Sequence, residues 1–120
     1  MNLTADQALQ VYRGWDEDEG WVYGELGKSD NLTCIFEPTM FYRVPYASVG
    51  IFTGQFDTDD KPLFGSLPKT HGGDIVTDIT ESPMEVVFYE GKFRLKRNVF
   101  MVLLHPGVKI IGTQYEKDKS

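Results

Sequence analysis

The sequence predicts an all-β protein of one domain, with a barrel or a sandwich as its architecture. Its 120 residues are one domain's length, and a domain of this size buries roughly two thirds of its unfolded surface. Hydrophobic residues make up 41% of the chain, and eight Phe, six Tyr and two Trp supply large side chains for one core. Many short strand-like runs, separated by turn residues at close spacing, are typical of barrels and sandwiches.

A helix is predicted only at the start of the chain. Thr4 followed by Gln7 has the form of a capping box, with Ala5, Ala8 and Leu9 behind it. We therefore expect a short helix over about residues 5–11, as a small addition before the β-fold.

The first half of the chain then predicts five strands. The segment "YRGWDEDEGWVYGEL" (12–26) indicates two strands around an acidic five-residue turn, a composition that favours a hairpin loop. Further strands are expected at 32–37, 40–44 and 49–56. Pro38 and Pro45 mark the breaks between them, because proline cannot donate to a central ladder.

A long loop is expected after residue 56, followed by strands to the end of the chain. The strand-like runs are 74–79, 84–90, 92–96, 99–104 and 108–115. Glu90-Gly91 is a two-residue hairpin signal, and "HPG" (105–107) separates the last two strands. The final residues, "EKDKS", are expected to be solvated and frayed.

The net charge and the single cysteine indicate which partners and which cellular compartment to expect. Twelve Lys and Arg against eighteen Asp and Glu give a net charge of −6, which argues against sustained nucleic-acid binding. Cys34 is the single cysteine and cannot form an internal disulfide, which fits a reducing compartment. The first residues lack the basic start and apolar run of a signal peptide, and "VFMVLL" (99–104) is too short to span a bilayer. We expect a cytoplasmic protein with no membrane partner.

The Asp-rich segment 57–60 invites a comparison with calcium loops. An EF-hand loop needs Gly at its sixth position and Glu at its twelfth. Counted from Asp57, these positions hold Pro62 and Pro68. The preferred interpretation is a solvated turn, since Asp is common in turns for backbone reasons.

Other residue types that often carry chemistry are also interpreted as structural. His71, His105 and Cys34 show no zinc-ligand spacing; the histidines are expected in exposed loops and Cys34 as a small apolar residue of a strand. Gly72 and Gly73 lead into a β-branched run, which indicates a tight bend rather than a phosphate loop, with Asp74 bonding local amides. We therefore expect no catalytic residue, no metal, no cofactor and no enzyme activity.

A stripe of basic residues leaves nucleic-acid binding as an alternative function. Lys92, Arg94 and Lys96 alternate along a predicted strand and share a face, with Arg97 beside them. Such a stripe could contact nucleic acid, but it lacks aromatic residues on the same face for base stacking. A solvated strand face is the preferred interpretation, and nucleic-acid binding is the alternative.

Four segments in this order resemble the YopX family of phage and prophage proteins. They are "YRGWDEDEGWVYGEL", "SVGIFTGQFDTDDKPLF", "GGDIV" and "IIGTQYE", and the resemblance runs from about Tyr12 to Glu116. The chain departs from the family by an inserted "GSLPKTH" (65–71) and by its ending "KDKS". The matching positions are Arg13, Gly14, Trp21, Val22, Tyr23, Gly24, Val49, Gly50, Phe52, Thr53, Gly54, Gly73, Asp74, Ile75, Val76, Ile111 and Gly112.

The resemblance implies a single domain over residues 1–120, with an SH3-like barrel and extra strands. It also implies a phage or prophage origin and an intracellular setting, but it brings no activity and no catalytic residue. The expected function is therefore that of an accessory protein, which acts through contacts with an unidentified host or phage protein.

Self-association is expected through the last third of the chain. "VFMVLL" offers six consecutive apolar side chains, and a strand sends alternate side chains to opposite faces. Only one face of a small barrel looks into the core, so the other set needs a cover. The helix over residues 5–11 is one possible cover; a symmetric homo-oligomer is the expected one.

Overall fold

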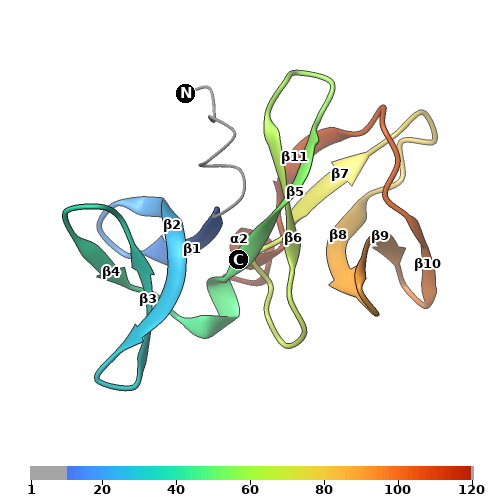
Figure 1. The fold of residues 1–120 in the computed structure, drawn as a ribbon. Helices are drawn as coiled ribbons and strands as arrows, with labels where there is room; N and C mark the ends of the chain where they lie inside the picture. The colour runs from blue at the N-terminus through green and yellow to red at the C-terminus, as the bar shows by residue number, and fades with distance from the viewer. Residues whose placement is uncertain (1–10, 120) are drawn as a thin grey trace.

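The computed structural model describes residues 11–119, which fold mainly into β-strands (Figure 1). The all-β class is confirmed, whereas the SH3-like barrel stays a prediction. The helix expected over residues 5–11 lies, Val11 apart, outside the described residues. In chain order the elements are β1 (Tyr12–Asp16), β2 (Gly20–Ser29), β3 (Leu32–Phe36), β4 (Phe41–Arg43), η1 (Tyr46–Ser48), β5 (Gly50–Phe56), β6 (Pro62–Ser66), β7 (Asp74–Thr77), β8 (Met84–Tyr89), β9 (Lys92–Arg97), β10 (Phe100–Leu103), β11 (Lys109–Thr113) and α2 (Gln114–Lys119).

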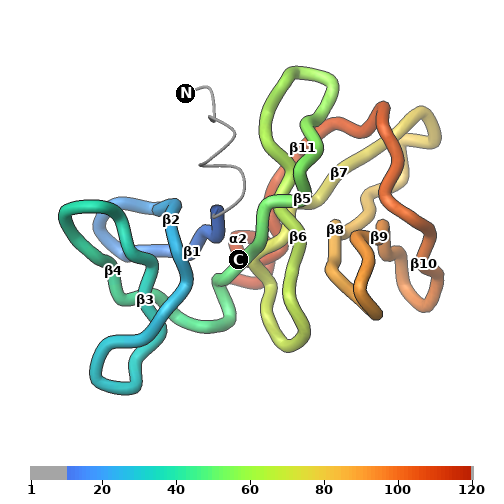
Figure 2. Tube along the Cα trace, in the orientation of Figure 1, coloured from blue at the N-terminus to red at the C-terminus, as the bar shows by residue number. Residues whose placement is uncertain are grey.

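The strands pair along one continuous path. Its order is β10-β9-β8-β6-β5-β1-β2-β3-β4, with β7 paired to β8 and β11 paired to β7. All pairs are antiparallel except β6 with β8. Figure 2 shows the chain passing from β1–β4 at one end, through the β5–β6 hairpin, to β8–β10 at the other. Within residues 11–119, β4 and β10 stand at the two ends of this path.

The segment that the sequence predicts as a long loop contains a strand, β6. β6 pairs with β5, and Leu63 and Phe64 are both buried. A strand covered on both faces shows no apolar–polar alternation, which is why its sequence resembles a loop. Pro62 is tolerated because it stands at the first residue of the strand.

The expectation of a frayed end is also wrong, because the last described residues form α2. The ring of Tyr115 lies 6.3 Å from that of Trp15 and 6.1 Å from that of Trp21. The indole Nε1 of Trp21 donates to Glu116 at 3.1 Å. A highly charged segment is thus held by aromatic packing against the β1–β2 hairpin, and the last strand ends at Thr113.

The core is divided into three clusters. One lies among β6–β9 and β11, a second lies among β1–β4, and a small third one joins Val11, Phe52 and Phe64. The buried residues of the first two are Leu63, Val76, Val86, Leu95 and Val108, and Val22, Ile35, Val44 and Val49.

Candidate functional site

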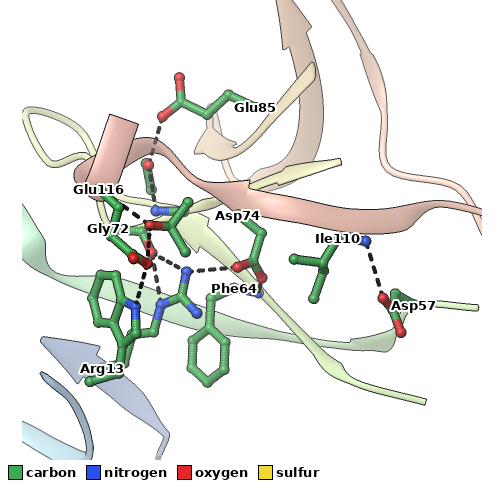
Figure 3. A network of polar contacts seen from close by, with 12 residues as sticks. Arg13, Asp57, Phe64, Gly72, Asp74, Glu85, Ile110 and Glu116 are labelled. Atoms are coloured by element: carbon green, nitrogen blue, oxygen red, sulfur yellow. Dashed lines mark hydrogen bonds and ion pairs between the residues drawn. The ribbon is translucent and has the colours of Figure 1, made fainter. Parts of the chain in front are cut away.

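Arg13 and Asp74, two positions of the family resemblance, form a buried ion pair (Figure 3). The guanidinium Nη2 lies 2.8 Å from Asp74 Oδ1, and it also donates to the Gly72 carbonyl oxygen at 2.7 Å. The guanidinium stands over the rings of Trp21 and Phe64, at 4.3 Å and 4.6 Å from their centroids. β1 and β7 are thereby joined through a buried cation.

Asp74 is bonded across the fold rather than to its neighbours. Its Oδ2 accepts from the Phe64 amide at 2.8 Å, ten residues earlier in the chain. The expectation of local amide bonds is therefore wrong. Burial raises the pKa of the Asp74 carboxyl, while Arg13 and the Phe64 amide act in the opposite direction. Because both oxygens are bonded inside the protein, the arrangement holds the fold together and offers no base to a substrate.

The glycines near this pair are required by close backbone approach. A Cβ on Gly50 would meet the Gly72 carbonyl, and a Cβ on Gly73 would meet the Val86 carbonyl and, at 2.5 Å, the Ser66 nitrogen. Gly73 has no positive φ, so the bend at 72–73 rests on packing and not on a left-handed conformation. The hydroxyl of Ser66 links this bend to β8, since it accepts from Gly73 N and donates to Glu85 at 2.7 Å.

The remaining positions of the resemblance lie around this ion pair or in nearby strands. A Cβ on Gly14 would meet Val44, and a Cβ on Gly24 would meet the Phe36 carbonyl. The Tyr23 and Phe52 rings pack on Phe64. Val22, Val49, Ile75 and Val76 are buried, whereas Thr53, Gly54, Ile111 and Gly112 lie in the outer parts of β5 and β11.

The expected solvated turn is present at residues 58–60, which are exposed, but Asp57 departs from the expectation because it is buried. Its Oδ1 accepts from the amides of Asp59 and Lys61, at 2.8 and 2.9 Å, and its Oδ2 accepts from the Ile110 amide at 3.1 Å. Burial opposes ionisation, but these backbone donors hold the pKa of Asp57 below its usual range. The carboxylate thus fastens the turn to β11 (Figure 3).

The two histidines and the cysteine have separate structural roles. His71 and His105 are both half-exposed, and each pairs with a separate aspartate, Asp118 at 3.1 Å and Asp78 at 3.6 Å. Cys34 is buried in β3. In the described part of the chain, no three His, Cys, Asp or Glu side chains gather in a way that could hold a metal ion.

The basic stripe lies on one face of the β8–β9–β10 meander. The register pairs Tyr89 with Lys92, Lys96 with Met101, and Leu103 with Arg94. Directly opposed residues share a face, so Tyr89 stands beside the stripe and is 46% exposed. The statement that the stripe lacks an aromatic on its face is therefore wrong. We call the surface of Tyr89, Lys92, Arg94, Lys96, Met101 and Leu103 the basic face.

A groove of about 260 Å³ borders the basic face. One wall is the segment 66–71, and the opposite side includes Glu85, Val87, Tyr89, Lys96 and Met101. No local sequence pattern predicts this wall, because it is placed by long-range contacts with β8, namely the parallel pair of Ser66 with Val87 and the hydrogen bond from the Ser66 hydroxyl to Glu85.

The outer edge of β10 is the second exposed feature. Val99 is 89% exposed, Phe100 70% and Val102 53%. The amide of Leu104 donates to Phe93 of β9 at 3.0 Å. Because donors alternate in an antiparallel pair, the amides of Met101 and Leu103 point away from β9. Within residues 11–119, β10 has no other neighbour.

Comparisons with known proteins identify no relative of this chain. No family model matches the chain, and no significant match is found among curated proteins or solved structures. Across residues 11–119, none of the helices has the length and apolar character needed to cross a membrane.

Proposed function

We propose that this chain is a phage or prophage accessory protein similar to the YopX family, which acts through protein contacts in the host cytoplasm without catalysis. The observation that carries the proposal is the open edge of β10, where apolar side chains are exposed on both faces. Monomeric proteins blunt such edges with charge, proline or a covering element. An uncovered one is a surface for another chain.

The positions of the family resemblance support a structural role for that motif. Arg13, Asp74 and Gly73 meet in one buried network whose polar atoms bond to one another. Within residues 11–119, no buried side-chain nitrogen or oxygen lacks a hydrogen-bond partner. A catalytic centre needs groups free to meet a substrate, so this arrangement favours a binding protein over an enzyme.

An SH3-like barrel with extra strands is the architecture that we propose. β2 pairs with β1 through residues 20–24 and with β3 through residues 25–29. A strand that passes from one sheet to the next in this way forms a corner in barrels and orthogonal sandwiches.

The first partner that we propose is a second copy of the chain. Two β10 strands, paired antiparallel about a two-fold axis, would satisfy the outward amides of Met101 and Leu103. The same contact would cover Phe100 and Val102, which are exposed in the single chain. The result is a symmetric homo-oligomer that leaves the basic face open.

Light scattering coupled to size exclusion tests this assembly. We expect the wild type to elute as a dimer or larger closed species, and Phe100→Lys to elute as a monomer. Ile79→Lys is the matched control, because Ile79 is 97% exposed but lies in a turn outside the strands. A wild type that stays monomeric at high micromolar concentration would overturn the proposed assembly.

Nucleic-acid binding by the basic face is the second candidate, favoured by one observation. Tyr89 lies next to Lys92 on that face, which combines an aromatic ring with cations. A shift of labelled DNA or RNA at about 150 mM salt, lost in Arg94→Glu, would promote this candidate over the first.

A further inference from the structure

The groove beside the basic face has the size of a site for individual side chains. Its volume of about 260 Å³ is below the roughly 300–1,000 Å³ typical of cofactor and drug-like sites. One wall is the segment 66–71, and the apolar part of the lining includes Val87, Tyr89 and Met101. One or two side chains of an extended peptide would fit there.

The charges around this groove are unbalanced. Lys69 and Lys96 line it, and Lys92 and Arg94 continue the positive surface along β9. Within residues 11–119, none of these four cations forms an ion pair. Two carboxylates lie close: Glu85 stands opposite Lys96 in the strand register and accepts the Ser66 hydroxyl at 2.7 Å, and Asp118 pairs with His71 at 3.1 Å. The four cations outnumber these two carboxylates.

This surface also contrasts with the rest of the molecule. Residues 11–61 hold four Lys and Arg against ten Asp and Glu, whereas residues 62–119 hold eight against seven. A partner with negative charge is therefore repelled by residues 11–61, whereas the cations at the groove and along β9 attract it. Opposite potentials of this kind set orientation and raise association rates.

We propose that the groove and the basic face bind an acidic peptide segment of a partner protein, in extended conformation and with apolar residues among its carboxylates. Carboxylates would meet Lys69, Lys96 and Arg94, while an apolar side chain would enter between Tyr89 and Met101. This inference deepens the proposed function and rests on its claim that the protein acts through protein contacts.

A peptide fits these observations better than nucleic acid does. Glu85 lies within the groove and would repel a phosphate backbone, whereas a peptide can place an apolar side chain beside it. The net charge of −6 opposes a polyanion along its whole length. A short peptide carries few charges and contacts only the basic face.

Fluorescence anisotropy tests the proposal with a short labelled peptide in which Glu and Leu alternate. We expect saturable binding that weakens as salt rises. Replacing every Glu of the peptide by Gln should weaken binding by about tenfold, since the charge pairs with Lys69, Lys96 and Arg94 are lost together. Lys96→Glu and, separately, Lys69→Glu should have effects of similar size. Lys28→Glu, on the exposed part of β2, is the matched control and should change little.

Two further arms separate the outcomes. Phe100→Lys should keep its affinity for the peptide, so failure of the dimer leaves this result intact. Equal binding of the Glu and Gln peptides, or no binding at millimolar peptide, would overturn the proposal. Tighter binding of a single-stranded oligothymidylate than of the peptide would also overturn it, in favour of nucleic acid.

Discussion

Arg13 and Asp74 stand 61 positions apart in the chain, yet their side chains form a 2.8 Å ion pair that is almost fully removed from water. The Arg13 guanidinium also bonds to the Gly72 carbonyl and lies between two aromatic rings. This pair therefore ties the β1–β2 hairpin to β7.

Removing one partner of this pair should destabilise the protein strongly. In Arg13→Met the buried carboxylate of Asp74 loses its counter-ion, and breaking such a pair costs about 3–5 kcal/mol. Arg43→Met is the matched control, since Arg43 pairs with Asp30 at 3.6 Å on the exposed surface, where pairs contribute about 0–1 kcal/mol. Urea unfolding measures both free energies. Equal losses of unfolding free energy in the two variants would show that the buried pair contributes no more than the exposed one.

Gly73→Ala should also destabilise the protein, for a steric reason. The added Cβ would meet the Val86 carbonyl and the Ser66 nitrogen, and overpacking of this kind costs about 1–3 kcal/mol. Gly112→Ala is the control, because nothing lies within 4 Å of a Cβ there. The thermal midpoints of the two variants measure the difference in stability. A Gly73→Ala protein as stable as Gly112→Ala would contradict the close packing at the 72–73 bend.

The pH dependence of stability should report on Asp57. Its carboxyl has a lower pKa in the folded protein than in the unfolded chain, where the value is about 3.9. Ionised Asp57 therefore stabilises the fold above that unfolded value, and the contribution is lost as the pH falls through the lower, folded pKa. The pKa of Asp78 is also lowered, first by the hydrogen bond from the Thr80 hydroxyl, so its contribution has the same sign.

The variant Asp57→Asn isolates the first of these contributions. We expect it to lose about 1–3 kcal/mol at pH 7, because the amide group cannot accept all three backbone donors. Its stability should also fall less than that of the wild type between pH 5 and pH 2. Asp60→Asn, on the exposed tip of the same turn, serves as the control. If both variants followed the wild-type pH curve, Asp57 would not be the group responsible.

Added metal ions should leave the melting temperature unchanged. The oxygens of Asp57 are occupied by three backbone amides, and His71 and His105 pair with different aspartates. A ligand that binds only the folded form must raise its stability. Differential scanning fluorimetry with millimolar calcium or stoichiometric zinc provides the measurement, and a rise of several degrees would contradict this interpretation.

Local patterns in the sequence were enough to predict the fold class and most strands. Where neighbouring residues alternate, as at Lys92–Lys96, the pattern indicates both the strand and the face that each side chain takes. β6 was missed because Leu63 and Phe64 are both buried, so that no alternation is visible. α2 was missed because its stability comes from Tyr115 packing on Trp15 and Trp21, far away in the sequence.

The candidate site was predictable only in part, because part of it depends on contacts between residues far apart in the sequence. The shared face of Lys92, Arg94 and Lys96 follows from their spacing. That Tyr89 joins this face depends on the register of β8 against β9. That the segment 66–71 forms a wall depends on a long-range contact between β6 and β8. Neither the register of β8 against β9 nor the contact between β6 and β8 can be recognised in a single sequence.

Amide hydrogen exchange of Met101 and Leu103 tests the claim that the open edge of β10 binds a second copy of the chain. Both amides point away from β9 if donors alternate from the Leu104–Phe93 bond. We expect their exchange to slow as the protein concentration is raised, and to stay fast in Phe100→Lys at every concentration. Fast exchange of both amides in the wild type at high micromolar concentration would contradict the claim.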